Sequence, residues 1–269
     1  MLILIVTFLL TGLFSGLIAG LLGVGGGIII VPVSYFILLK LGYSIDVVMH
    51  VSVASSLCII VFTSISSVRS HIKLNNVDRN VVKKWVAGII SGSIIGSLLA
   101  SRIEGEILVL IFISLAFLIS LNMFFQRNIK TIGNDIPHSF FINFSISGLI
   151  GLFSALIGIG GGSFSVPILS IFSKKMHKAV GTSAVLGFFI ALPGAISYII
   201  LGINIEGLPP YSLGYVNILI VALVISTSVF TANIGAKLSS RIRREILKKI
   251  FAIFLLFTCT SLVIEHFII

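Results

Sequence analysis

The amino-acid sequence predicts an all-α polytopic membrane protein of about ten transmembrane segments, two of them short or broken, arranged as two five-segment inverted repeats. Three observations predict this fold: an apolar composition, a glycine cluster in each half, and large basic clusters in alternate loops. Of the 269 residues, 57% are hydrophobic and only 10% are charged, whereas soluble domains carry about 25% charged residues. Several apolar stretches reach the roughly 20 residues that a spanning helix needs.

The apolar segments form two groups separated by a polar stretch. They cover approximately 2–22, 28–41, 51–68, 81–101 and 106–125 in the first group, and 139–157, 163–173, 179–201, 214–238 and 246–266 in the second. The polar stretch between them contains Gly133 and Pro137. We therefore expect a first repeat over 1–126, a cytoplasmic linker over 127–138 and a second repeat over 139–269.

Three sequence motifs recur in the same order in the two halves. They are GVGGG at 23–27 and GIGGG at 158–162, VASS at 53–56 and VGTS at 180–183, and IGSLLASRI at 95–103 and IGAKLSSRI at 234–242. A proline follows five residues after each glycine cluster, at Pro32 and Pro167. This order indicates that each half is one copy of the same unit.

The basic residues predict the orientation. The chain carries 18 Lys and Arg against 8 Asp and Glu, a net charge of +10. Because these cations lie between apolar segments, they indicate cytoplasmic loops facing a lipid bilayer rather than a nucleic-acid partner. With the basic loop 69–84 inside, alternation places the linker and the clusters at 174–178 and 241–249 inside as well. An odd number of segments per repeat then inverts the second repeat relative to the first.

The short segments 28–41 and 163–173 leave an alternative open. The 11 residues of 163–173 reach only about 16 Å as a helix, against a hydrocarbon core of about 30 Å. If this segment crosses, it either takes residues from its flanks or contains non-helical backbone; otherwise it is re-entrant. Re-entry of both segments would leave the clusters at 174–178 and 241–249 outside, against the positive-inside rule. The charge distribution therefore favours ten crossings.

Broken segments at matching places in two halves predict a transporter binding site. A helix that restarts after a glycine break presents free N–H groups and its positive dipole end, which favour an anion. Glycine also permits close helix packing, and to that role we assign Gly92, Gly96 and Gly235. The candidate substrate-binding residues are the clustered glycines, nearby hydroxyl donors and one amide: Gly25, Gly26, Gly27, Ser55, Ser56, Gly160, Gly161, Gly162, Ser163, Thr182, Ser183 and Asn233.

Other chemistries have little support in the sequence. No Asp or Glu lies in the middle of an apolar segment, and His50, just before the third segment, suits an interfacial position. Cys58 and Cys259 form no CxxC pair, so we expect no redox pair, metal site or cofactor. The GTSA stretch at 181–184 leaves a remote alternative, an intramembrane serine protease, but its only downstream apolar histidine is His266. We assign no catalytic residue and predict that the protein is not an enzyme.

The repeated stretches GLIAGLLGVGGGIIIVP at 16–32 and GLIGLFSALIGIGGGSFSVP at 148–167 resemble the sulfite exporter TauE/SafE family of membrane permeases. The VGTS stretch and the Ile-Gly motifs followed by Arg102 and Arg241 are also similar to the family, although Ala54 replaces a glycine in the first half. The resemblance implies transport of sulfite, sulfonates or related organic anions across a bacterial plasma (inner) membrane.

A secondary transporter would work by alternating access around the paired glycine breaks, with a proton or sodium ion as the possible coupling ion. An anion channel of the same architecture is the alternative. The particular anion, the direction of transport and the oligomeric state are left open by the sequence.

Overall fold

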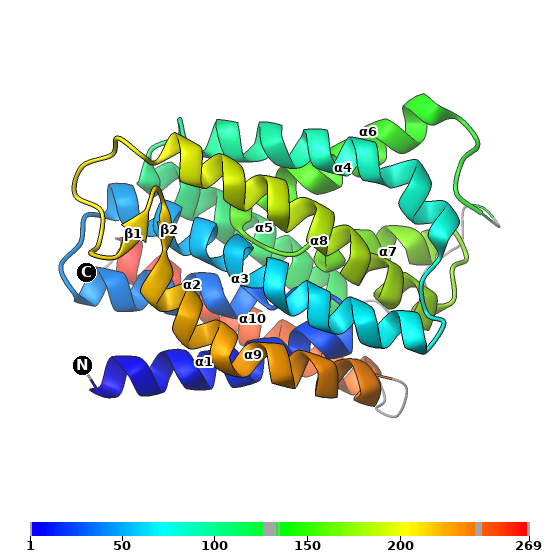
Figure 1. The fold of residues 1–269 in the computed structure, drawn as a ribbon, viewed down its shortest axis with the longest axis horizontal. Coiled ribbons are helices and arrows are strands. Elements are labelled where there is room, and N and C mark those ends of the chain that lie inside the picture. The colour runs from blue at the N-terminus through cyan, green and yellow to red at the C-terminus, as the bar shows by residue number, and fades with distance from the viewer. Residues whose placement is uncertain (1, 126–132, 134, 240–243, 268–269) are drawn as a thin grey trace.

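The computed structural model describes residues 2–125, 133, 135–239 and 244–267, with only the backbone described for 244–248, 250–251 and 266–267. It is all-α apart from one short hairpin (Figure 1). The helices are α1 (Leu2–Leu22), α2 (Gly27–Lys40), α3 (Ile45–Lys73), α4 (Arg79–Ala100), α5 (Gly105–Phe125), α6 (Phe140–Ile157), α7 (Gly162–Ile171), α8 (Met176–Leu201), α9 (Ile218–Leu238) and α10 (Arg244–Phe267). The strands β1 (Ser212–Leu213) and β2 (Val216–Asn217) pair antiparallel before α9.

Among the described residues, seven helices are long and apolar enough to span a membrane: α1, α3, α4, α5, α6, α8 and α9. Shorter apolar helices cover Gly27–Lys40, Gly162–Ile171 and, within α10, Ala252–Glu265. The chain is a multi-pass membrane protein, as predicted, and each predicted segment corresponds to one helix. Two predicted boundaries were wrong. The start of segment 214–238 is a hairpin, and α3 begins early enough to include His50.

Polar residues explain where three of the helices begin. Side-chain oxygens accept hydrogen bonds from backbone N–H groups of the first turn at Ser44 before α3, Asp78 before α4 and Asn217 before α9. Such caps satisfy N–H groups that have no intrahelical partner. In contrast, α2 and α7 follow Gly26 and Gly161, and neither glycine position supplies a side-chain cap. The two short helices therefore begin with N–H groups that no capping side chain satisfies.

Helix contacts come in matching pairs between the two halves. The most extensive contacts are those of α1 with α9 and of α4 with α6. The helices that correspond between the halves are α1 and α6, and α4 and α9, so each of these two contacts is the counterpart of the other. The contacts α3–α9 and α4–α8 correspond in the same way, as do α2–α3 and α7–α8. At the centre, α3 packs on α8, while α5 packs on α10. Each half thus repeats the packing of the other.

Glycines bring the α1–α9 and α4–α6 pairs into backbone contact. A Cβ on Gly92 would overlap the carbonyl oxygen of Gly148, and one on Gly235 would overlap that of Leu17. A Cβ on Gly96 would likewise overlap the Leu152 carbonyl. The packing role predicted for these three glycines is confirmed. Trp85 adds to the α4–α6 contact, because its fully buried indole Nε1–H donates to Asn143 Oδ1 at 2.8 Å.

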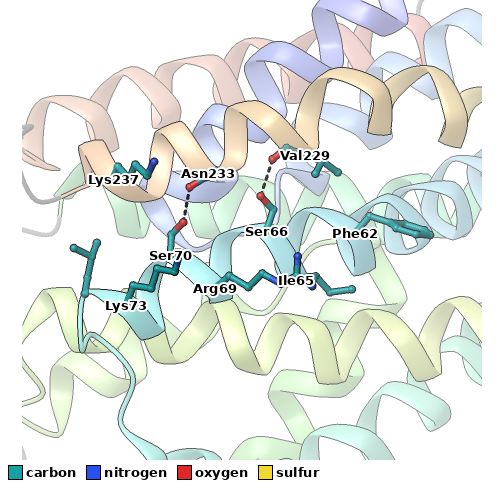
Figure 2. Close-up of a pocket in the computed structure, with 10 residues that line it drawn as sticks. Phe62, Ile65, Ser66, Arg69, Ser70, Lys73, Val229, Asn233 and Lys237 are labelled. Atoms are coloured by element: carbon teal, nitrogen blue, oxygen red, sulfur yellow. Dashed lines mark hydrogen bonds between the residues drawn. The ribbon is translucent and has the colours of Figure 1, made fainter.

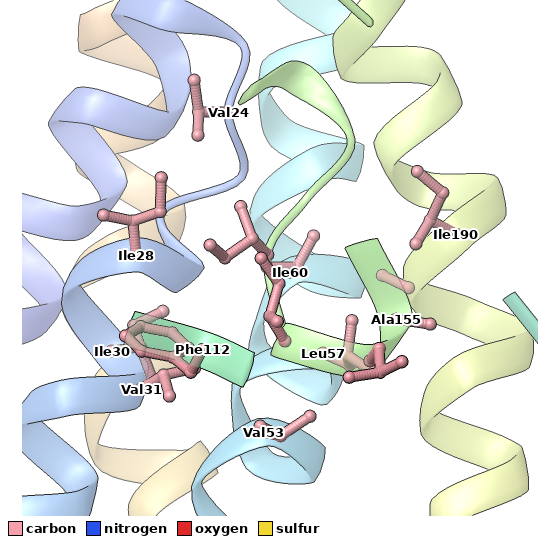
Figure 3. Packing of buried hydrophobic residues seen from close by; sticks show 14 of the residues in the cluster. Val24, Ile28, Ile30, Val31, Val53, Leu57, Ile60, Phe112, Ala155 and Ile190 are labelled. Carbon is pink, nitrogen blue, oxygen red and sulfur yellow. The ribbon is translucent and has the colours of Figure 1, made fainter. Parts of the chain in front are cut away.

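The apolar core surrounds the two glycine breaks. Val24, Ile28, Leu57, Ile60 and Ile190 from α2, α3, α8 and the first break converge there and are almost fully buried (Figure 3). Non-helical backbone at membrane depth is tolerated only where protein or a water-filled cavity surrounds it. Here the surrounding side chains supply that protein environment.

The described basic loops gather at one end of the helix bundle. The loops from α3 to α4 and from α7 to α8 both lie at the end of the bundle opposite the start of α1 and the end of α10 (Figure 1). The cations of these loops and of the adjoining helix ends include Arg69, Lys73, Arg79, Lys83, Lys84, Lys174, Lys175 and Lys178. The predicted basic positions at 127, 130, 241 and 243 lie outside the described residues. The end of the bundle at which these loops lie is called the basic end below.

At the basic end, Lys174, Asp78 and Asp135 form an ion-pair cluster. Lys174 Nζ lies 2.8 Å from Asp78 Oδ2 and 2.8 Å from Asp135 Oδ1. Burial opposes ionisation of Asp78, but the Lys174 ammonium and the capping N–H groups outweigh it and lower the pKa of that carboxyl. The hydrogen bond from Lys174 also lowers the pKa of Asp135. The cluster joins the N-terminus of α4 to the loop before α8 and to the linker.

Replacing Lys174 by Ala should destabilise the protein by about 1–2 kcal/mol at neutral pH, because it removes two charge-assisted hydrogen bonds. Both carboxyls have depressed folded-state pKa values. Their stabilisation is therefore complete above their unfolded pKa of about 4 and is lost as the pH falls through the lower folded values. Thermal unfolding of both proteins from pH 7 to pH 3 checks this: the difference between them should shrink in acid. A constant difference would contradict the assignment.

Candidate functional site

The two glycine breaks cross each other at the centre of the molecule. A Cβ on Gly160 would lie 2.9 Å from the Gly25 Cα, closer than real Cβ contacts come. A Cβ on Gly162 would overlap the carbonyl oxygen of Gly23, and one on Gly27 would overlap that of Gly158. The structure therefore brings both predicted clusters together, with backbone packed on backbone.

Left-handed backbone makes each break possible. Gly23 has φ +68° and Gly158 has φ +71°, and these are the corresponding residues of the two clusters. Gly25 and Gly26 are also left-handed, at +81° and +79°. Glycine adopts this conformation without steric cost, whereas other residues do so rarely. The sequence folds into breaks at these places because only glycine permits both the turn and the crossing.

The repeated hydroxyl pairs hold the crossing in place. Ser56 Oγ donates to the Gly158 carbonyl at 2.7 Å, and Ser183 Oγ donates to the Gly23 carbonyl at 3.2 Å. Ser55 Oγ accepts the Asn217 N–H at 2.9 Å, and Thr182 Oγ1 accepts the Asp78 N–H at 2.8 Å. Each pair thus bonds one glycine break and the beginning of one long helix in the opposite half. Binding of a substrate by these four hydroxyls stays a prediction.

A small cavity of about 10 Å³ lies beside the crossing, in space enough for about one water. It is lined by Ala19, Gly23, Gly25, Thr63, Ser64, Ser67, Ala184 and Gly187. The Ser67 hydroxyl is buried and has no hydrogen-bond partner among the described residues, and the same holds for Ser163 at the start of α7. Unpaired buried donors are costly, so they suit a site that a polar ligand completes.

The backbone nitrogen of Gly161, just before α7, lies near the same region. An added Cβ at Gly187 would lie 3.6 Å from Ser64 Oγ and 4.0 Å from the Gly161 nitrogen. The uncapped N-terminus of α7 and the hydroxyls of α3 therefore flank one small space. Sequence reasoning missed Thr63, Ser64, Ser67 and Gly187. The hydroxyl-rich run TSISSVRS at 63–70, inside an otherwise apolar segment, is the signal that could have found the first three.

Asn233 lies in a separate, open pocket between α3 and α9 at the basic end (Figure 2). The pocket has a volume of about 410 Å³ and is lined by Phe62, Ile65, Ser66, Arg69, Ser70, Lys73, Leu74, Val229, Asn233 and Lys237. Ser70 Oγ donates to Asn233 Oδ1 at 2.6 Å, and Ser66 Oγ donates to the Val229 carbonyl at 2.7 Å. These bonds join α3 to α9 along the pocket lining. The cationic side chains of Arg69, Lys73 and Lys237 in the lining favour the binding of anions in this pocket.

Ser183, the nucleophile of the protease alternative, is fully buried and donates to backbone carbonyls of Gly23 and Val180. The side chain of His266 lies outside the described residues. Among those residues, no group of three or more His, Cys, Asp or Glu could hold a metal ion.

Apolar spanning helices in two similarly packed halves, with broken short helices crossing at the centre, define a polytopic membrane transport protein. The model of the family described as Sulfite exporter TauE/SafE matches residues 8–262, and the chain belongs to that family.

Similar proteins agree with this assignment. A "Probable membrane transporter protein" of Haemophilus influenzae is 32% identical over 96% of this chain and 97% of its own length. The "Probable membrane transporter protein YunE" of Bacillus subtilis is 27% identical over 97% of each chain. A probable membrane transporter protein of Methanocaldococcus jannaschii is 28% identical over 90% of this chain and 88% of its own length. No solved structure matches the chain.

Proposed function

We propose that this protein is a secondary transporter of small oxyanions, of the sulfite and sulfonate class, in a bacterial plasma membrane. The observation that carries the proposal is the crossing of two uncapped helix starts beside buried hydroxyls without partners. Helix N-termini and hydroxyl donors bind oxyanions without needing a buried cation. Membership of the sulfite exporter TauE/SafE family supports a sulfur oxyanion as cargo.

We further propose that residues 1–126 and 139–269 are inverted repeats that rock against each other around this site. The matched helix contacts and the matched hydroxyl bonds to the glycine breaks support such a relation. The central space of about 10 Å³ is too small for an oxyanion. This supports a carrier in a closed conformation rather than an open channel. Opening would require the crossing or the flanking helices α3 and α8 to move.

The open pocket at the basic end fits a cytoplasmic vestibule for this site. Ser66 and Ser70 of α3 line the pocket, whereas Ser64 and Ser67 of the same helix line the central cavity. Helix α3 thus lines both spaces. Positive charge in such a hollow raises the local concentration of anions.

Transport by purified protein in liposomes tests the proposal. Sulfite, sulfonates, sulfate, thiosulfate and carboxylates would be offered at equal concentration, with uptake and counterflow measured for each. We expect saturable uptake and counterflow for one class of sulfur oxyanion, and selective thermal stabilisation by the same class. Saturable flux restricted to carboxylates would reject the sulfur assignment. Non-saturating flux without counterflow would indicate a channel.

Replacing Arg69 by Gln should raise the KM for transport from the basic side several-fold while changing the maximal rate little, because it weakens electrostatic attraction into the vestibule. Raising the ionic strength from about 0.01 to 0.15 M should reduce the difference between variant and wild type, since salt screens exposed charges. Arg79→Gln, at the same end but outside this pocket, is the matched control. An equal effect of both substitutions would show that the pocket has no special role.

A further inference from the structure

His50 occupies an unusual position at the end of the bundle opposite the basic end. It is 3% exposed, and both of its ring nitrogens contact backbone carbonyl oxygens. Nδ1 lies 2.7 Å from the carbonyl oxygen of Asp46, one turn back in α3, and Nε2 lies 3.0 Å from that of Ala100. The imidazole also stacks on Tyr215 of the hairpin, with 5.1 Å between ring centroids. One side chain therefore joins α3, α4 and the hairpin.

The chemistry of the two contacts depends on the number of protons on the ring. A carbonyl oxygen only accepts hydrogen bonds, and a neutral imidazole has one donor and one acceptor nitrogen. A neutral ring would therefore donate to one carbonyl and turn a lone pair toward the other. Only an imidazolium donates to both Asp46 and Ala100.

The position of Ala100 at the end of α4 and the ring of Tyr215 also suit a cation at His50. Ala100 is the last residue of α4, where the carbonyl groups carry the negative end of the helix dipole. The face of the Tyr215 ring attracts cations through its quadrupole. The contact of His50 with Tyr215 crosses between the halves, and within the second half Tyr215 packs edge-on against Tyr198 of α8 at 6.2 Å.

The charged groups of the elements packed here are few and lie at the periphery. They are Asp46 at the start of α3, Arg102 and Glu104 in the turn after α4, Glu106 at the start of α5 and Glu265 in α10. The first four are exposed, and Glu265 is partly exposed. Among the described residues, none of them forms an ion pair with His50. The backbone carbonyls and Tyr215 are thus its immediate partners.

We propose that His50 binds the proton that couples anion transport to a pH gradient. With two protons it bonds α3 to the end of α4 and holds this end of the transporter closed. On opening, the contact with Ala100 breaks and the ring releases one proton to the solvent at this end. An imidazole passes between a form with one N–H donor and a form with two by gaining or losing one proton. The inference names the coupling ion of the proposed transporter and rests on that function.

The repeat supplies a matching histidine at the other end. Met49-His50 and Met176-His177 stand at the same distance before VASS and VGTS in the two halves. His50 is buried whereas His177 is exposed at the basic end. In an inverted repeat, opening of one end and closing of the other would exchange these two environments. Access to the proton would then alternate together with access to the anion.

The test compares wild type with His50→Gln in liposomes, using sulfite as the probe anion. Gln keeps an N–H donor and cannot titrate in this range. In wild type, an imposed pH gradient should drive accumulation, and the uptake rate should change several-fold between about pH 5 and 8. In His50→Gln, gradient-driven accumulation should be lost and the pH profile should flatten, while sulfite counterflow at equal pH persists. His138→Gln, an exposed linker substitution, should behave as wild type.

The outcomes separate the coupling proton from the transport function. Absence of sulfite flux and counterflow in wild type, extended across the panel of anions, would reject the proposed transporter itself. Flux in wild type that ignores the pH gradient, or an unchanged pH profile in His50→Gln, would overturn the role of His50 alone. If His50→Gln does not fold, His50→Asn and direct measurement of proton uptake per anion in wild type decide the same point.

Discussion

Replacing Gly187 by Ala should reduce anion flux at least about tenfold while leaving the protein as stable as wild type or more stable. The added methyl group would stand 3.6 Å from Ser64 Oγ and 4.0 Å from the Gly161 nitrogen, both ordinary contact distances. It would therefore fit, but between the donors and an incoming anion. A lost hydrogen bond to a charged ligand costs roughly 1.5–3 kcal/mol, which is a tenfold or larger loss of affinity.

Stability should move in the opposite direction, because Ala replaces Gly in the interior of α8 and gains about 0.5–1 kcal/mol of helix propensity. Flux in liposomes and thermal unfolding in detergent measure the two effects. Gly148→Ala is the matched control, since this helical glycine of α6 would place its Cβ 3.6 Å from the Gly88 carbonyl oxygen and does not line the cavity. Normal flux in Gly187→Ala would place the substrate elsewhere.

Replacing Gly162 or Gly27 by Ala should destabilise the protein by about 3 kcal/mol or more. In each case the new Cβ would overlap a backbone carbonyl oxygen of the other half, at Gly23 or Gly158 respectively. Backbone cannot move aside as a flexible side chain can, so the crossing must separate. The two corresponding substitutions should have similar effects, because their contacts match between the repeats.

Unfolding midpoints and the yield of folded protein in detergent would measure the cost. Gly187→Ala serves as the control here, because it adds the same methyl group at the same centre without a clash. Wild-type stability in Gly162→Ala would show that the two breaks do not cross as described.

The sequence predicted the number, order and approximate extent of the helices because apolar length and loop charge are local properties. It also predicted the glycine breaks and their correspondence, since matching motifs in two halves are visible without coordinates. It could not find the hairpin before α9, because Tyr215 and Val216 there are buried by tertiary contacts and read as part of an apolar segment. The sequence also predicted an interfacial position for His50, because the contacts with Ala100 and Tyr215 that bury this side chain are tertiary contacts.

The sequence by itself determined that this chain is a membrane protein with two similar halves and that each half contains a glycine break. Those properties depend on hydrophobic length and backbone freedom, which individual residues carry. Only the tertiary structure decided that the breaks cross, that Ser56 and Ser183 bond them, and that Ser64, Ser67 and Gly187 surround the remaining space. Those contacts join residues more than a hundred positions apart, and no local pattern specifies which partner a buried hydroxyl will meet.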